Sequence, residues 1–205
     1  MKRVPIVATL IVVLAVALMI KLGFWQLDRS TEKAALIARY ASAAQLPPIA
    51  YPAIPVGEQY LFRTASGLCL EPVDEQFESG RSTDGRAGWR HIIACRTGAE
   101  GPGMMVDAGW SANLTPHRPW KGGVVNGVIG QMPDHQSLLA RALGGAKSRT
   151  LLLIANTPAP GLSPSALPDI ADIPNNHMSY AVQWFVFAAL ACGIYLIALS
   201  LRLRR

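Results

Sequence analysis

Hydrophobic residues are concentrated at the two ends of the 205-residue chain. One apolar segment begins at Val4, and a second runs from about Tyr180 to Leu201. Each is close to the roughly 20 residues that a helix needs to cross the hydrocarbon core of a bilayer. The residues between them are polar enough, and contain enough glycine and proline, to form a water-exposed domain. The pattern predicts two terminal membrane helices that hold one domain outside the bilayer.

The segments between the two ends differ in composition and in the secondary structure they predict. Residues 25–45 are rich in helix formers and extend the first membrane helix, residues 4–24, as a stalk that ends near the prolines after Leu46. Residues 46–156 hold short β-branched and aromatic runs separated by turn residues, which is typical of strands. These runs are 60–64, 68–73, 88–95, 103–110, 124–130 and 150–156. We therefore expect an α+β membrane protein with a barrel-like, antiparallel β-rich domain.

Six further segments complete the predicted organisation. Residues 74–85 combine carboxylates with serine and glycine and indicate an exposed loop, and residues 136–143 predict one short helix. Residues 157–176 contain five prolines and predict a linker that returns the chain to the second membrane helix, residues 177–201. Residues 1–3 and 202–205 are short tails.

The charges predict how the chain lies in the membrane. The two tails carry five of the 19 basic residues and none of the 13 acidic ones. By the positive-inside rule, both termini are cytoplasmic and the central domain is translocated. The alternative is that the tails are basic by chance and that the central domain is cytoplasmic. Because the net charge of +6 comes mostly from the tails, it indicates topology and contact with membrane lipid, and no affinity for nucleic acid.

The first apolar segment has a cleaved signal peptide as its alternative. A cleavage site needs a polar region with small residues, but the Ala15–Ala17 pattern lies inside the apolar run. Lys21 and the aromatic pair Phe24–Trp25 instead suit a membrane interface. We expect a retained anchor. The three residues before it leave no room for a transit peptide, so we expect a two-pass protein of the bacterial inner membrane with a periplasmic domain.

The three cysteines fall into two groups. Cys192 lies in the second apolar segment, where it packs as a small residue. Cys69 and Cys95 lie in the translocated domain, where an oxidising compartment permits a disulfide that stabilises the fold by roughly 3–4 kcal/mol. A copper site is the alternative, although no closely spaced cysteine pair supports it.

Signatures of catalysis are missing from the sequence. The motifs Gly-x-Ser-x-Gly, His-Glu-x-x-His, Cys-x-x-Cys and the phosphate-binding loop are absent. We expect that the protein is not an enzyme, while a triad assembled from distant residues stays open.

His177 is the main candidate for a functional side chain. Asn175 or Asn176 can cap the second membrane helix, which places His177 in its first turn, where the positive end of the helix dipole favours the neutral imidazole that binds metals. The residues on the same helix face are Tyr180 or Ala181, Trp184 and Ala188. An aromatic ring followed by small residues leaves space for a flat apolar ligand such as haem. The alternative is an interfacial histidine that bonds lipid headgroups.

Two basic residues of the stalk lie just outside the membrane. If the two helices pack side by side, Arg29 and Lys33 lie at the height of His177. They can bind the propionates of a haem or the phosphates of lipids.

Two motifs resemble those of the Surfeit-locus (Surf/Shy) family of cytochrome c oxidase assembly proteins. Residues 23–33 resemble its Gly-x-Trp-Gln-x-x-Arg-x-x-x-Lys motif, and residues 176–185 resemble its Asn-His-x-x-Tyr-Ala-x-x-Trp-Phe entry to the second membrane helix. The family's plan, two terminal helices around a β-rich domain, covers the whole chain. Residues 106–112 depart from the family's Val-Asn-Arg-Gly-Trp-Val-Pro pattern, and Cys69 and Cys95 are additions.

The resemblance implies a function and a site. It implies an assembly factor for a haem-copper oxidase that binds haem a between its two membrane helices and aids its delivery to the oxidase catalytic subunit. His177 takes the place of the family's proposed ligand to the haem iron. The other residues expected at the site are Trp25, Arg29, Lys33, Tyr180 and Trp184. The alternative function is a two-pass scaffold that stabilises nascent oxidase subunits without binding haem.

Overall fold

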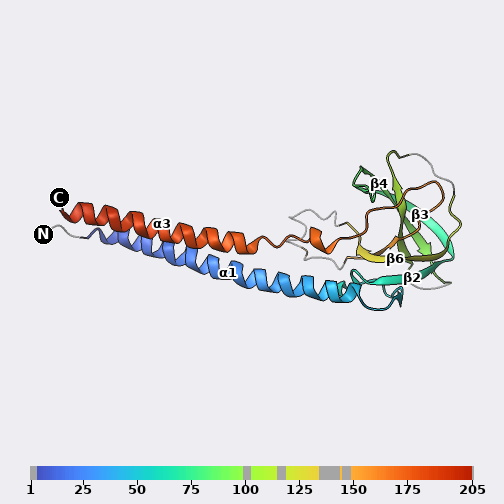
Figure 1. The fold of residues 1–205 in the computed structure, drawn as a ribbon, viewed down its shortest axis with the longest axis horizontal. Helices are drawn as coiled ribbons and strands as arrows, with labels where there is room; N and C mark the ends of the chain where they lie inside the picture. The colour runs from blue at the N-terminus through green and yellow to red at the C-terminus, as the bar shows by residue number, and fades with distance from the viewer. Residues whose placement is uncertain (1–3, 99–102, 115–118, 134–143, 145–148, 205) are drawn as a thin grey trace. The chain divides into compact units, whose positions relative to one another are not determined.

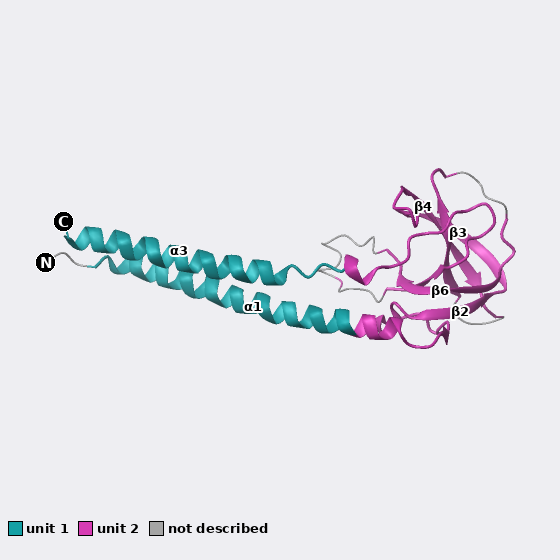
Figure 2. Ribbon diagram, in the orientation of Figure 1, with its two compact units in different colours: residues 1–38, 173–205 teal, residues 39–172 magenta. Residues whose placement is uncertain are grey.

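The computed structural model describes residues 4–98, 103–114, 119–133, 144 and 149–204. The chain divides into two compact units (Figure 2). One is helical and comprises Met1–Ala38 with Ile173–Arg205, and the other is the β domain, Arg39–Asp172.

The helical unit pairs the two ends of the chain. Helix α1 spans Ile6–Ala44 and helix α3 spans His177–Arg204, and both are long and apolar enough to cross a membrane (Figure 1). Thr9 is hydrogen bonded to Tyr195 and Gln26 to His177, so the helices run antiparallel. Most of their apolar side chains are exposed, as expected of surfaces that contact lipid. The fold is thus that of an α+β two-pass membrane protein.

The contact between the helices has a regular period. Residues that are at least partly buried recur at alternating steps of four and three, which is the 3.5-residue repeat of left-handed helix pairs. On α1 this row is Thr9, Val12, Val16, Met19, Gly23, Gln26, Ser30 and Lys33. On α3 they are His177, Ala181, Trp184, Ala188, Ala191 and Tyr195. We call these two rows the seam.

The β domain contains one mixed sheet of seven strands, in the order β1-β2-β6-β7-β5-β4-β3. The strands are β1 Ile49–Ala50, β2 Thr64–Cys69, β3 Glu71–Arg81, β4 Ala87–Arg96, β5 Met104–Ser111, β6 Gly123–Gln131 and β7 Leu151–Ala155. The β1–β2 and β5–β7 pairs are parallel and the others are antiparallel. The expectation of an antiparallel sheet was wrong for these two pairs. β7 lies between β6 and β5, which run in opposite directions, so β7 can be antiparallel to only one of them.

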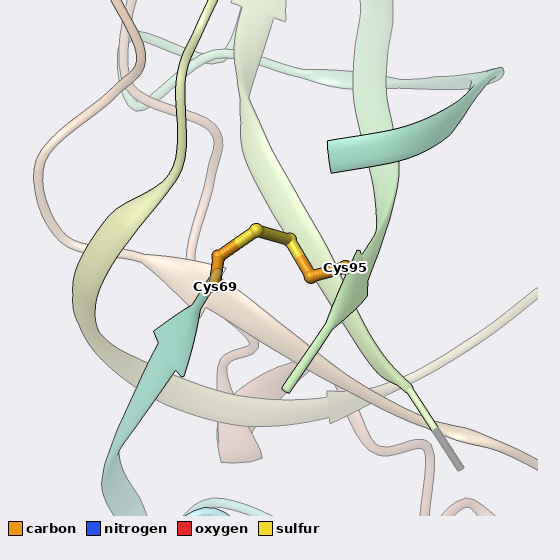
Figure 3. The surroundings of a disulfide bond; sticks show 2 residues. All are labelled: Cys69 and Cys95. Atoms are coloured by element: carbon orange, nitrogen blue, oxygen red, sulfur yellow. A yellow bond between two sulfur atoms is a disulfide. The ribbon is translucent and has the colours of Figure 1, made fainter. Parts of the chain in front are cut away.

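The sheet curls until its ends approach each other. β2 and β3 stand near opposite ends of the strand order, yet only Leu70 separates them in the chain. A disulfide joins Cys69 of β2 to Cys95 of β4, with their Cα atoms 5.2 Å apart (Figure 3). The backbone N–H of Leu70 donates to the carbonyl of Arg96 at 2.8 Å. The edge strands β1 and β3 do not pair, so the structure is barrel-like but not closed.

The core of the sheet explains why its central strand has no polar alternation. All five residues of β7 are buried, as in a strand covered on both faces. Leu152 and Ile154 of β7 pack with Ile92 of β4, and Met105 and Met132 cover this cluster. The apolar run predicted as a strand at residues 150–156 is therefore the centre of the domain.

Several local predictions need correction. Residues 74–85, expected to be a loop, form most of β3 and the turn after it. An edge strand pairs on one side and carries charged side chains, so its composition resembles that of a loop. Residues 60–64, expected to be a strand, instead run from the last residue of a short 3₁₀ helix, Glu58–Tyr60, to the first residue of β2, Thr64. The helix expected at residues 136–143 lies outside the described residues.

Candidate functional site at the paired helix ends

His177 is the first residue of α3, and its position is defined by contacts with α1. Its Nδ1 lies 2.7 Å from Oε1 of Gln26. The carbonyl of Asn176 accepts the first helical hydrogen bond, from the N–H of Tyr180 at 3.3 Å, so Asn176 is the N-cap residue. Nδ2 of Asn175 donates to the carbonyl of Ser30 at 3.3 Å. The start of α3 is therefore attached to α1 at two successive turns.

The seam is filled just below this polar end. A Cβ atom added to Gly23 would lie 2.6 Å from the ring of Phe185, so the glycine is needed for this close approach. Phe24 makes an edge-on contact with the same ring, with centroids 5.4 Å apart. Ala181 and Ala188 are buried. The small residues expected to leave space for a flat ligand therefore lie in the contact between the helices.

The aromatic residues predicted for the site lie in different surroundings. Trp184 is partly buried on the seam and makes an edge-on contact with Phe187, with ring centroids 6.3 Å apart. Trp25 and Tyr180 are 49% and 45% exposed. They present aromatic surface beside the polar end of the helix pair.

The basic residues of the site differ in their environment. The guanidinium of Arg29 lies 5.9 Å from the centre of the Trp25 ring, within the range of a cation–π contact. Its Nη1 also forms an exposed ion pair with Glu32 at 2.6 Å. Lys33 is partly buried on the seam. Sequence reasoning missed Glu32, whose carboxylate offsets the charge of Arg29.

Gln26 was also missed, although two features of the sequence point to it. It is part of the motif at residues 23–33, and it continues the steps of four and three that lead from Gly23 to Ser30. Among the described residues, no group of three or more His, Cys, Asp or Glu side chains can hold a metal ion. His177 fits a metal that needs one protein ligand, as the iron of a haem does.

Comparison with known proteins identifies the family. A model of the SURF1 family matches residues 13–189, which is most of the chain. The chain belongs to the SURF1 family. The match includes both motifs and so confirms the resemblance; the family is associated with cytochrome c oxidase assembly and is not known to be catalytic. No individual curated protein matches the chain.

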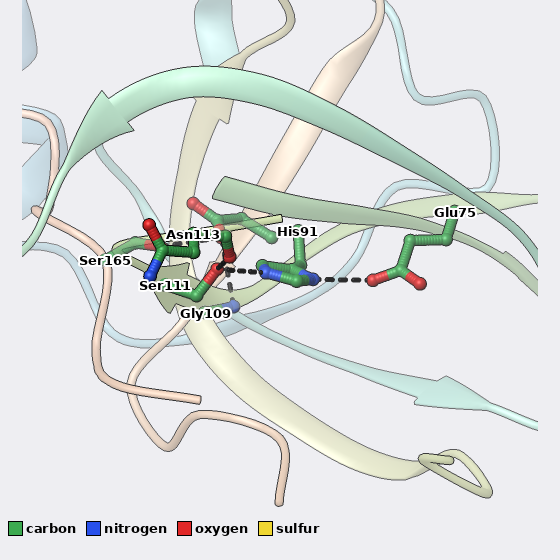
Figure 4. Close-up of polar contacts among 7 residues, drawn as sticks. Glu75, His91, Gly109, Ser111, Asn113 and Ser165 are labelled. Atoms are coloured by element: carbon green, nitrogen blue, oxygen red, sulfur yellow. Dashed lines mark hydrogen bonds and ion pairs between the residues drawn. The ribbon is translucent and has the colours of Figure 1, made fainter. Parts of the chain in front are cut away.

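The β domain of this SURF1-family protein contains a polar relay that crosses three strands (Figure 4). His91 on β4 is fully buried. Its Nδ1 lies 2.7 Å from Oε1 of Glu75 on β3, and its Nε2 lies 2.7 Å from Oγ of Ser111 on β5. The Ser111 hydroxyl donates to the carbonyl of Asn113 at 2.7 Å. Sequence reasoning could not pair these residues, because they meet only through the strand order.

The order carboxylate, imidazole, hydroxyl is also that of a hydrolase triad, but the arrangement fits a structural relay. The hydroxyl has the carbonyl of Asn113 as a second acceptor at 2.7 Å, so its one hydrogen is not committed to His91. The imidazole is enclosed, with 0% of its surface exposed. Two cavities in the domain do not include Ser111; they are lined by Val106, Trp120 and Pro158 in one case and by Val56, Arg96 and Met104 in the other.

A buried carboxylate on β5 binds the return segment to the sheet. Asp107 is fully buried and accepts from Nε of Arg90 at 2.6 Å. Its other oxygen accepts from Oγ of Ser165 at 2.8 Å and from the N–H of Gly109 at 3.1 Å. Asp107 stands where the family pattern has asparagine, and the charge it adds is balanced by Arg90.

Proposed function

We propose that this protein is an assembly factor for a haem-copper cytochrome c oxidase that binds haem a beside His177. It would pass the haem to the catalytic subunit of the oxidase, with its β domain in the periplasm of a bacterial inner membrane. The observation that supports this most directly is the position of His177. Its ring is held at the end of a membrane-length helix, and among the described residues none hydrogen bonds to Nε2.

Other side chains at this end of the helical unit have the chemistry that a haem site needs. His177 would bind the iron, and Lys33 and Arg29, whose charge Glu32 partly offsets, would offer cations for the two propionates. The exposed rings of Trp25 and Tyr180 offer apolar contact. Because Phe185 closes the seam over Gly23, we place the ligand against the side of the helix pair near His177, and not between the helices.

The number of ligands fits a role in hand-over. This site would offer a haem iron one protein ligand, His177. A carrier that must release its cargo needs modest affinity, and a single ligand at a partly exposed site provides this. The catalytic subunit would then remove the haem by binding it more tightly.

An assembly factor that binds only protein is the second candidate. The exposed apolar side chains of both helices support it, as does Gly193, where an added Cβ would meet no atom within 4 Å. A membrane helix of an oxidase subunit can approach closely at such a residue.

A haem spectrum of the purified protein separates the two candidates. The full-length protein is produced in a host that makes haem a, purified in detergent and examined as the pyridine haemochrome. We expect haem a in the wild type and its loss in His177→Ala, with helical circular dichroism unchanged. Gln183→Ala, at an exposed position of the same helix, is the matched control and should keep its haem. Absence of haem from the wild type, or full retention in His177→Ala, would refute haem binding at this site.

A further inference from the structure

The hydrogen bond between α1 and α3 decides which nitrogen of His177 is free. The atom of Gln26 that lies 2.7 Å from Nδ1 is the amide oxygen. An amide oxygen accepts and cannot donate, so the shared hydrogen belongs to Nδ1. In a neutral imidazole the other nitrogen, Nε2, then carries a lone pair. A lone pair on Nε2 is what an iron ligand requires.

The contacts around Gln26 keep this arrangement in place. Gln26 lies on the seam between Gly23 and Ser30, and each of these neighbours has its own contact with α3 or with the residues just before it. The ring of Phe185 lies over Gly23, and Asn175 donates to the carbonyl of Ser30. These contacts, one turn of α1 to either side, fix the register of the helices. The amide of Gln26 is therefore brought to His177 by the packing of the two helices.

We propose that Gln26 is a positioning residue for His177, which holds the ring as the Nδ1–H tautomer and presents Nε2 to the haem iron. This inference rests on the proposed haem function. Its physical reason is that of metal-binding histidines in general, in which the ring N–H opposite the metal donates to an acceptor that fixes the tautomer and the ring orientation. In this role Gln26 acts through His177 and is not itself a ligand.

The tautomer can be measured without haem. Protein labelled with ¹⁵N and ¹³C at histidine is placed in lipid bilayers at pH 8, above the range in which a free imidazole titrates. Solid-state NMR then distinguishes protonated from unprotonated ring nitrogens, and His177→Ala identifies the His177 signals. We expect Nδ1 protonated and Nε2 unprotonated in the wild type. Gln26→Leu removes the acceptor and should move the proton largely to Nε2, the nitrogen that carries it in the free histidine side chain.

Two further variants make the result specific. The ionised carboxylate of Gln26→Glu accepts and does not donate, so this variant should keep the hydrogen on Nδ1. Gln183→Leu makes the same change as Gln26→Leu at an exposed position of α3, and should leave the His177 signals unchanged. If Gln26→Leu disturbs the helix pair, Gln26→Glu still tests the inference. An ionised carboxylate beside Nδ1 of His177 requires the shared hydrogen to be on that nitrogen.

Haem affinity supplies the second readout. Detergent-solubilised apoprotein is titrated with haem a and followed in the Soret band. We expect Gln26→Leu to bind at least about tenfold more weakly than the wild type, with Gln26→Glu much closer to it. A wild type with Nε2 protonated overturns the inference, and so does a Gln26→Leu protein that loses affinity with its tautomer unchanged. If the wild type binds no haem a, the proposed function fails, while the NMR result still decides the role of Gln26 toward His177.

Discussion

Reduction of the Cys69–Cys95 disulfide should lower the free energy of unfolding of the β domain by about 3.5 kcal/mol. The bond closes a loop of 26 residues. In the chain-entropy model, closing a loop of this length removes roughly 12 cal/mol/K from the unfolded chain, which is about 3.5 kcal/mol at 25 °C. Both cysteines are 1% exposed, so reduction leaves two thiols in an apolar site they already fill and adds little further cost.

The size of the domain converts this energy into a temperature. The β domain spans Arg39–Asp172, and unfolding entropy is about 2.1 cal/mol/K per residue, or about 0.28 kcal/mol/K for about 130 residues. A loss of about 3.5 kcal/mol then lowers the melting temperature by roughly 12 °C.

The assay compares the same protein in two redox states. Full-length protein carrying Cys192→Ser is heated in detergent, oxidised or reduced, and near-ultraviolet circular dichroism follows the β domain. Cys192→Ser alone, at an exposed position, should melt like the wild type. The double variant Cys69→Ala/Cys95→Ala should lose slightly more than the reduced protein, because it also empties space in the core. A shift below about 4 °C on reduction would refute the reasoning, because it would show that the cross-link hardly restricts the unfolded chain.

Four further outcomes test other parts of the structure. Gly127→Ala should destabilise the β domain by at least about 2 kcal/mol in chemical denaturation, because an added Cβ would lie 2.0 Å from the carbonyl oxygen of Ile154. The control is Val124→Ala, at an exposed position of the same strand, which should change stability by less than about 0.5 kcal/mol. Asp107→Asn should cost about 3 kcal/mol because it leaves the largely buried Arg90 without its carboxylate, and a second substitution, Arg90→Met, should recover part of the loss. Burial raises the pKa of Tyr51, whose hydroxyl donates to the carbonyl of Leu151. The folded state therefore keeps this proton at a pH where the unfolded state loses it. The unfolding free energy should fall as pH rises above about 10, and Tyr51→Phe should reduce the slope of that fall. Reporter fusions at Arg205 and Thr83 should report cytoplasm and periplasm respectively, and a cytoplasmic signal at Thr83 would contradict the proposed topology.

The elements that follow from local pattern were predictable from the sequence. The two terminal helices and strands β4 to β7 each have a continuous pattern of their own, and their expected ranges agree closely with the structure. Segments whose character depends on their neighbours were not predictable in this way. Residues 74–81 are a strand because β4 pairs with them, and Ile49–Ala50 is a strand because β2 lies beside it. Their own side chains carry too little information to show this.

The candidate site likewise has a part that was predictable from local sequence and a part that was not. An asparagine before an apolar run was enough to place His177 in the first turn of α3. Its partner Gln26 lies 151 residues away in the chain, so the contact depends on the register of the helix pair. The relay of Glu75, His91 and Ser111 likewise depends on which strands are neighbours. Single-residue chemistry was therefore accessible from the sequence, whereas pairing across elements required the fold.

The place of β7 determines how early the domain can fold during synthesis. β7 is the last strand to be made, yet it lies between β6 and β5 in the sheet. Until the ribosome has added residues 151–155, the strands already made can pair only within two separate groups, β1, β2 and β6 in one and β5, β4 and β3 in the other. Each exposes the apolar surface that β7 will cover, so the growing polypeptide is prone to aggregation throughout this interval. Oxidation of Cys69 and Cys95, on β2 and β4, is the covalent step that can join the two halves before the sheet is complete.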